Sequence, residues 1–121
     1  MRFFDVAVTF TADQFRGIYR GKKYHEPDFA EVLKRAKDYG CEKTMLTTMS
    51  LSGAEQNLQL VREFPELCKM TLGVHPYHAG EIYADHDEGS KDGQNQHIEH
   101  IKNLADTLLA ESPSSLAAFG E

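Results

Sequence analysis

The chain has 121 residues, enough for one domain with a modest core and about half of the roughly 250 residues that a closed β/α barrel needs. With 40% hydrophobic and 26% charged residues, it has the composition of an ordinary soluble globular protein. The formal net charge of −6 argues against a general electrostatic grip on nucleic acid, although it leaves room for local contacts or metal-bridged phosphates.

Other features of the composition point to the inside of a cell. Cys41 and Cys68 lie far apart and form no CxxC pattern, which predicts free buried thiols in a reducing compartment. No apolar run approaches the roughly 20 residues of a membrane span, so we expect no membrane partner. The apolar residues 3–8 contain a charge and are too few for a signal-peptide core. The expected location is the cytoplasm or the nucleus.

The first half of the chain alternates between strand-like and helix-like apolar patterns. Residues 3–8 predict a strand, and a long polar loop is expected over residues 9–26. Pro27 suits a first helical position, apolar residues then recur at i, i+3, i+4 and i+7, and Gly40 is a good helix stop. The β-branched-rich segment 44–48 predicts the second strand.

The second half continues this alternation. Ser52 and Glu55 are expected to open a helix as a capping box, and Pro65 closes it. A strand over 70–75 and a Gly/Asp/Asn-rich surface loop over 79–96 follow. The last two expected elements are a helix with apolar residues from Ile98 to Leu108 that ends at Ser112, and a buried strand over 116–119. The order β-α-β-α-β-α-β predicts an α/β fold of parallel strands joined by right-handed crossovers.

Two architectures fit this order. Four β/α strands are the N-terminal half of an eight-stranded, TIM-type (β/α)₈ barrel. They also suffice for a small open three-layer sandwich, and the apolar pattern alone does not separate the two.

The polar residues of interest follow strands, at the end of a parallel sheet where the βα-loops converge and ligands bind. The strongest local motif is the segment 73–78, GVHPYH. Val74 ends an apolar strand, so His75 is aimed at the rim, and Pro76 stiffens the exit. There His75 can contact a phosphate or orient a water; the alternative is a histidine that caps its loop. His78 is expected to be a plain surface residue.

Two acidic residues are further candidates. Asp5 lies inside the first strand between Phe4 and Val6, where a carboxylate is costly unless it is hydrogen-bonded, paired or metal-linked, so functional and structural roles are both open. Glu121 follows the last expected strand, at the position where a β/α barrel places a metal ligand. Because the sequence stops there, the architecture reads as truncated after strand four.

The loop 15–25, FRGIYRGKKYH, mixes cations with aromatic residues. They are Arg16, Arg20, Lys22 and Lys23, interleaved with Phe15, Tyr19 and Tyr24. This mixture suits backbone phosphates together with base stacking; the alternative is a solvated loop whose rings pack on the rim. His97 and His100 are expected on a solvated helix face, without partners.

Taken together, these segments resemble the N-terminal half of the TatD family of metal-dependent deoxyribonucleases, especially its eukaryotic branch. Residues 4–6 (FDV) look like the opening F-x-D strand, and residues 14–21 (QFRGIYRG) look like the F-R-G-I-Y-R-G loop of that branch. Residues 73–76 (GVHP) resemble the G-x-H-P after strand three, and residues 118–121 (AFGE) resemble the start of the G-E-x-G-L-D signature. The resemblance covers essentially the whole chain.

The resemblance implies a (β/α)₈ barrel that hydrolyses DNA phosphodiesters, often from the 3′ end, with divalent metals that are usually Mg²⁺. It implies that Glu121 is a metal ligand, that His75 is a catalytic residue on the substrate side of the rim, and that Asp5 supports the floor of the site. The expected contacts to DNA come from Arg16, Tyr19, Arg20 and Lys22, together with Asp5.

The chain also departs from the family pattern. The wider family has an H-x-H pair on strand one, where this chain has Ala7 and Thr9, and its later metal-binding residues belong to strands beyond Glu121. We therefore expect residues 1–121 to be one incomplete domain of a deoxyribonuclease, inactive alone. The alternative is a non-catalytic α/β partner-binding module derived from the same barrel. In either case exposed sheet edges favour self-association.

Overall fold

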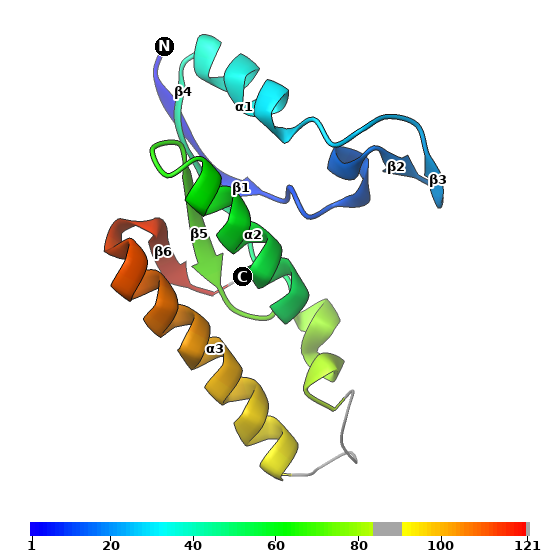
Figure 1. Ribbon diagram of the computed structural model, residues 1–121, viewed down its shortest axis with the longest axis vertical. Helices are drawn as coiled ribbons and strands as arrows, with labels where there is room; N and C mark the ends of the chain where they lie inside the picture. Colours follow the sequence, from blue (N-terminus) through cyan, green and yellow to red (C-terminus); the bar gives the residue numbers. More distant parts are fainter. Residues whose placement is uncertain (84–90, 121) are drawn as a thin grey trace.

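The computed structural model describes residues 1–83 and 91–120 and contains a four-stranded sheet (Figure 1). Its strands, in spatial order, are β1 (Phe3–Val8), β4 (Cys41–Leu46), β5 (Cys68–Leu72) and β6 (Leu116–Phe119). All neighbouring pairs are parallel, which confirms the predicted β/α fold. β4 and β5 begin earlier than predicted, because the ladder also includes Cys41, opposite Phe3, and Cys68, opposite Thr44. They also end earlier, at Leu46 and Leu72.

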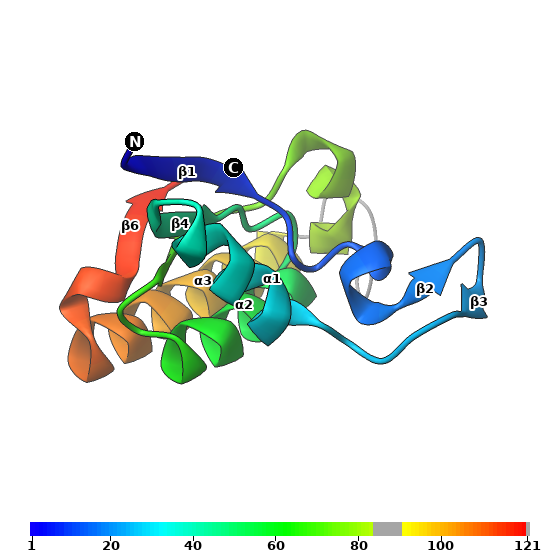
Figure 2. The ribbon, with the colours of Figure 1, turned by 90° about the horizontal axis from the view of Figure 1, so that it is seen from above.

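Three helices connect the strands of this sheet: α1 (Phe29–Asp38), α2 (Leu51–Glu63) and α3 (Lys91–Glu111). All three lie on one side of it (Figure 2), so the chain forms two layers and the three-layer sandwich is wrong. The buried core lies between the layers and includes Leu33, Leu46, Leu58, Val61, Met70, Leu72 and Leu108. Within residues 1–83 and 91–120, no helix is long and apolar enough to cross a membrane.

Ser50, not Ser52, caps helix α2. The Ser50 Oγ accepts a hydrogen bond from the Gly53 N–H at 3.1 Å, so the predicted capping box of Ser52 and Glu55 is wrong. Ser50 has the extended backbone that an N-cap requires, with φ −154° and ψ 169°. Ser52 lies within the first turn of the helix, where its Oγ is 3.2 Å from the Ser50 Oγ.

The segment predicted as a long polar loop contains regular structure. It holds a short 3₁₀ helix, η1 (Asp13–Arg16), followed by an antiparallel hairpin of β2 (Ile18–Tyr19) and β3 (Lys22–Lys23). Between these strands, Arg20 and Gly21 have positive φ angles of 50° and 75°, as a two-residue type I′ turn requires. The sequence signal for this turn is weak because arginine rarely adopts a positive φ.

The prediction of a surface loop over residues 79–96 is also wrong for those of its residues that the structure describes. Pro76–Tyr83 form a 3₁₀ helix, η2, and α3 already begins at Lys91. The first two turns of α3 bury Gly93 but no large apolar side chain, so the apolar period that predicts a helix is missing there. The prediction for residues 84–90 lies outside the described residues.

The two outer strands of the sheet are exposed, and the prediction of a buried last strand is wrong. In β1, Phe4 and Val6 expose 61% and 64% of their surface, and in β6 Phe119 exposes 67%. Within the part of the chain that the structure describes, β1 and β6 each pair with one neighbour only. Apolar residues identify a strand, but they do not show whether another element covers it.

The cysteines are free and buried, as predicted, with 3% exposure for Cys41 and none for Cys68. Burial raises the pKa of the Cys68 thiol, and the hydrogen bond from Thr44 opposes this only in part. Because the thiolate is the reactive form, iodoacetamide at about pH 8 should leave both cysteines unmodified in the native chain and alkylate both in denaturant. Mass spectrometry checks this, and rapid alkylation of native Cys68 would contradict it.

Candidate functional site

The exit from β5 carries His75. Its backbone N–H donates to the Met49 carbonyl at 2.9 Å, which ties the turn after β5 to the turn after β4. Helix η2 follows at once, and the His78 N–H donates to the His75 carbonyl at 2.8 Å. The backbone of His75 is therefore held on both sides, at the end of the sheet where the βα-turns meet.

The ring of His75 is oriented by its own turn. The Tyr77 N–H donates to Nδ1 at 3.1 Å, and the two rings have centroids 4.8 Å apart. Because Nδ1 accepts this hydrogen bond, the proton of the neutral imidazole lies on Nε2. Nε2 is thus left to donate to a ligand such as a phosphate oxygen. The loop-capping role and the phosphate-binding role are compatible, since they use different nitrogens.

The tip of β6 lies beside this turn. The Gly120 N–H donates to the Leu72 carbonyl at 3.0 Å, and a Cβ on Gly73 would collide with the Gly120 carbonyl, so only glycine allows this approach. The predicted metal ligand, Glu121, lies outside the described residues. In the described residues, no group of three or more His, Cys, Asp or Glu side chains is placed to hold a metal ion.

Asp5 is exposed, so its carboxylate does not carry the burial cost that the sequence argument assumed. Its Oδ1 accepts a hydrogen bond from the Ala7 N–H at 3.3 Å, and Asp5 pairs with Thr44 in the ladder of β1 and β4. No hydrogen bond, ion pair or ring contact within residues 1–83 and 91–120 joins Asp5 to His75. A role for Asp5 at the floor of the site stays a prediction.

The β2–β3 hairpin carries a surface of cations and rings, which we call the hairpin surface: Tyr19, Arg20, Lys22 and Tyr24. Tyr19 and Tyr24 meet edge to face with ring centroids 6.5 Å apart. The Arg20 guanidinium lies 5.3 Å from the Tyr19 ring centre, and the Lys22 ammonium lies 5.6 Å from that of Tyr24. Both rings are more than half exposed. Surfaces of this kind stack bases and neutralise phosphates.

The other cations of this loop are paired locally. Arg16 lies 3.9 Å from the Asp13 carboxylate, and Lys23 lies 2.6 Å from that of Glu26. The alternative prediction, that the rings of this loop pack on the protein, is right for Phe15, whose ring is partly buried against the core. The structure therefore divides the predicted loop into residues that are engaged within the protein and the hairpin surface, which is presented to solvent.

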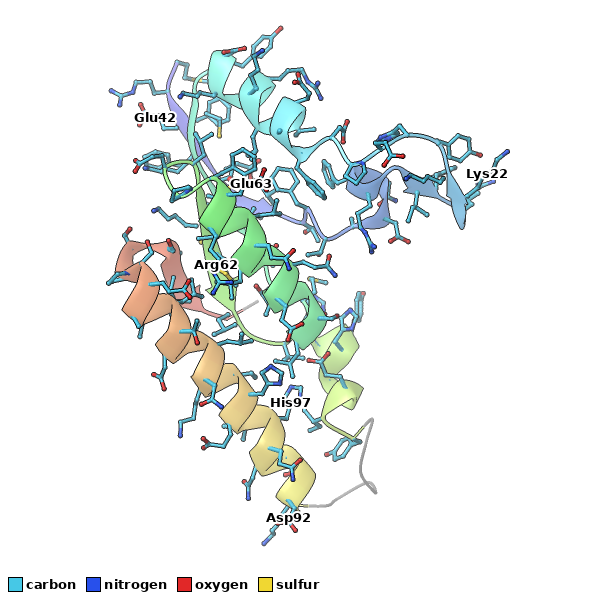
Figure 3. The ribbon with its side chains drawn as sticks, viewed as in Figure 1. Lys22, Glu42, Arg62, Glu63, Asp92 and His97 are labelled. Atoms are coloured by element: carbon cyan, nitrogen blue, oxygen red, sulfur yellow. The ribbon has the colours of Figure 1, made fainter. Side chains whose placement is uncertain are left out.

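The hairpin surface and His75 are not in contact. No hydrogen bond, ion pair or ring contact of the described residues joins them, and the hairpin projects away from the sheet (Figures 1 and 2), with Lys22 near its tip (Figure 3). The base of the hairpin is fixed: the Tyr24 N–H donates to the Gly17 carbonyl at 2.7 Å, and a Cβ on Gly17 would collide with the His25 carbonyl. The hairpin is thus a preformed arm.

The expected solvated helix face is wrong for His97 but right for His100, whose side chain is 48% exposed. The His97 side chain is 9% exposed, with Nε2 3.4 Å from Glu81 Oε1, and His100 Nε2 lies 3.6 Å from Glu55 Oε1. Glu81 belongs to η2, and its Oε1 accepts from the Leu51 N–H at 3.2 Å. The His97 ring (Figure 3) is thus buried beside a carboxylate of η2 that holds the start of α2, while its Nε2 has no hydrogen-bond partner among the described residues. Sequence reasoning missed this because Glu81 lies in the segment predicted as a loop.

Sequence reasoning also missed a set of buried polar residues, namely Thr48 after β4, Asn57 on α2 and Thr71 in β5. A signal was present, because Asn57 falls on the apolar face of α2 that Ala54, Leu58 and Val61 define. A polar residue in such a position normally finds hydrogen-bond partners inside the protein.

Parallel strands covered by helices on one side, with polar residues beyond the strand ends, are features of the β/α barrel. Solved structures agree. A hydrolase TatD family protein from Entamoeba histolytica matches with a TM-score of 0.80 and 25% identity, over 99% of this chain and 36% of that one. An uncharacterized amidohydrolase from Saccharomyces cerevisiae matches with a TM-score of 0.74 and 24% identity, with the same coverage.

The family itself follows from the sequence comparison. The TatD related DNase family matches residues 4–121, and the chain belongs to this family. It is 34% identical over 121 residues to deoxyribonuclease Tat-D of Schizosaccharomyces pombe, and 35% identical over 78 residues to the 3′-5′ ssDNA/RNA exonuclease TatD of Erwinia tasmaniensis. The chain spans 36% and 26% of the lengths of these relatives. The predicted family and the fold class are thus confirmed.

Proposed function

We propose that the chain is the substrate-binding N-terminal part of a metal-dependent deoxyribonuclease that acts on DNA phosphodiesters as an exonuclease, in the cytoplasm or the nucleus. The hairpin surface carries the proposal, because it combines exposed rings with cations that have no carboxylate partner among the described residues, on a chain whose net charge is −6. A protein of negative net charge needs such local cations to hold a phosphate backbone. The names of its relatives, deoxyribonuclease and ssDNA/RNA exonuclease, support the substrate class.

In this proposal the two parts of the site act on the same strand. The hairpin surface holds the nucleic acid, and Arg16 joins it where a phosphate competes with Asp13. His75 donates from Nε2 to an oxygen of the phosphate that is attacked, which stabilises the charge that develops there. Asp5 is the last residue of this chain that we propose to contact the substrate.

We also propose that the reaction requires a divalent metal ion, with Mg²⁺ as the first candidate. Bound in the site, it would polarise the phosphate and activate a water. The described residues do not form a metal site by themselves, and Glu121 is the ligand that we propose from this chain. Since a hydrolytic metal site normally needs about three protein ligands, we expect the 121-residue chain to have no appreciable nuclease activity alone. Mg²⁺-dependent cleavage that Glu121→Ala abolishes would contradict this.

The direct test of the proposal is the binding of fluorescent single-stranded DNA to the chain, followed by anisotropy at several salt concentrations. We expect binding that weakens as salt rises, because cations release counterions from the phosphates. Absence of binding at low salt would overturn the proposal.

His75→Ala tests the role of the imidazole. A hydrogen bond to a charged group contributes about 1.5–3 kcal/mol, so the substitution should weaken DNA binding by roughly 10- to 100-fold. The melting temperature should change little, since a half-buried rim residue makes few core contacts. His78→Ala is the matched control, because His78 is exposed in the same turn. Equal effects of the two substitutions on binding would contradict a specific role for His75.

The alternative, a non-catalytic module that binds a partner, is favoured by a separate observation. Phe4 and Val6 on one outer strand and Phe119 on the other leave apolar side chains exposed at both edges of the sheet. Such edges pair readily with other strands, and a second copy of the chain offers the same edges. Self-association is therefore part of this second proposal.

A further inference from the structure

A network of buried hydrogen bonds joins α2 to the ends of β4 and β5. Thr48, Asn57 and Thr71 expose no more than 2% of their surface. Asn57 donates from Nδ2 to the Thr47 carbonyl at 3.2 Å and to the Thr48 Oγ1 at 3.1 Å. Thr48 in turn donates from Oγ1 to the Thr71 carbonyl at 2.5 Å, and its N–H donates to the Thr71 Oγ1 at 3.0 Å. The Thr48 hydroxyl is thus both acceptor and donor, between a helix and a strand.

The network extends to the neighbouring turns through the backbone. The Thr47 N–H donates to the Val8 carbonyl at 2.8 Å, at the end of β1. Met49, which directly follows Thr48, accepts the hydrogen bond from the His75 N–H at 2.9 Å. The segment 47–49 therefore links the exits of β1, β4 and β5, and the side chains of Asn57 and Thr71 hold that segment in place.

Stability alone does not explain this network. Asn57 lies on an apolar helix face, and its Oδ1 is buried without a hydrogen-bond partner among the described residues. An unsatisfied buried acceptor destabilises the folded state, and an apolar side chain at such a place is often neutral or better. What the network does provide is a fixed backbone at 47–49, where the chain has left the β4 ladder.

We propose that Asn57, Thr48 and Thr71 are positioning residues that fix the turn of His75 through the Met49 carbonyl. The Met49 carbonyl holds the N–H of His75, and the Tyr77 N–H holds its Nδ1. The ring therefore keeps one orientation, in which Nε2 is already placed to donate to the phosphate when it binds. The network fixes the backbone of the turn and Tyr77 fixes the ring; the use of that ring on a phosphate rests on the function proposed above.

Two substitutions of Thr48 separate hydrogen bonding from packing. Thr48→Val keeps the volume but removes the hydroxyl that links Asn57 to Thr71, whereas Thr48→Ser keeps the hydroxyl and removes a methyl group. The measurement is amide hydrogen exchange by NMR in the 121-residue chain, with the His75 amide compared with the Ala54 amide inside α2. Thr48→Val should accelerate exchange at His75 about tenfold relative to Ala54, and Thr48→Ser by less than about threefold.

Val61→Ala is the control for general destabilisation, because Val61 is a core residue of α2 with no part in the network. It should lower the melting temperature without changing the ratio of the two exchange rates. Equal effects of Thr48→Val and Thr48→Ser, or the same change of ratio in Val61→Ala, would overturn the positioning role.

The binding of single-stranded DNA to the same variants distinguishes the two proposals. Weaker binding by Thr48→Val, with normal binding by Thr48→Ser, supports both. A Thr48→Val chain whose His75 turn exchanges faster but whose DNA binding is unchanged would support the positioning network and overturn the contact between His75 and phosphate.

Discussion

Replacing Arg20 and Lys22 together by alanine should weaken binding to single-stranded DNA by roughly 25-fold at 0.1 M salt, because each phosphate contact contributes about −0.7 to the slope of log K against log salt. The slope should therefore flatten by about 1.4. Both cations lie over tyrosine rings and have no carboxylate partner within the described residues, so they are available to a ligand. The loss should be even across DNA sequences, since phosphate contacts carry no sequence information.

The chain offers a matched control for this experiment. Arg16→Ala with Lys23→Ala also removes two cations from the loop, but both are paired, with Asp13 and Glu26. A phosphate must compete with those carboxylates, so we expect a smaller change of slope. Replacing all four should flatten the slope by at most about 2.8. If no variant changes the slope, the loop has a structural role and the proposed grip on DNA is wrong.

The alternation of strands and helices could be predicted because each element has its own apolar period. This criterion alone predicts the strands at 3–8 and 116–119 with the bounds that the structure shows. The hairpin could not be predicted in the same way. Its strands have two residues each and no apolar alternation, and its turn places Arg20 at a positive φ. What holds it is a contact of Gly17 with the backbone of His25, which is visible only in the folded chain.

The candidate site shows the same division. His75 could be singled out because it follows an apolar strand and precedes a proline, and the structure places it at the strand end. The partner of its N–H, Met49, follows another strand, so only the fold brings the two turns together. The error on His97 has a related cause, since its partner Glu81 lies in a helix that has no apolar period.

The second large effect that we expect is self-association of the 121-residue chain at micromolar concentration. β1 and β6 are the outer strands of the sheet, and each leaves one edge without a strand neighbour in the described chain. Unpaired edges that carry apolar side chains are ready to pair with another chain. Phe4, Val6 and Phe119 expose 61%, 64% and 67% of their surface, and pairing of two copies would bury part of it.

Lysine on an edge strand is the usual protection against such pairing, so Val6→Lys together with Phe119→Lys should shift the chain towards monomer. Ile98→Lys is the control, because Ile98 is 54% exposed but lies on helix α3 and not on an outer strand. Sedimentation velocity between about 1 and 100 µM measures the shift, and a dissociation constant of 1 µM corresponds to about 8 kcal/mol. We expect the double substitution to weaken association by at least tenfold and the control to leave it unchanged. A compact monomer at 100 µM that unfolds cooperatively would show that the exposed edges do not drive association.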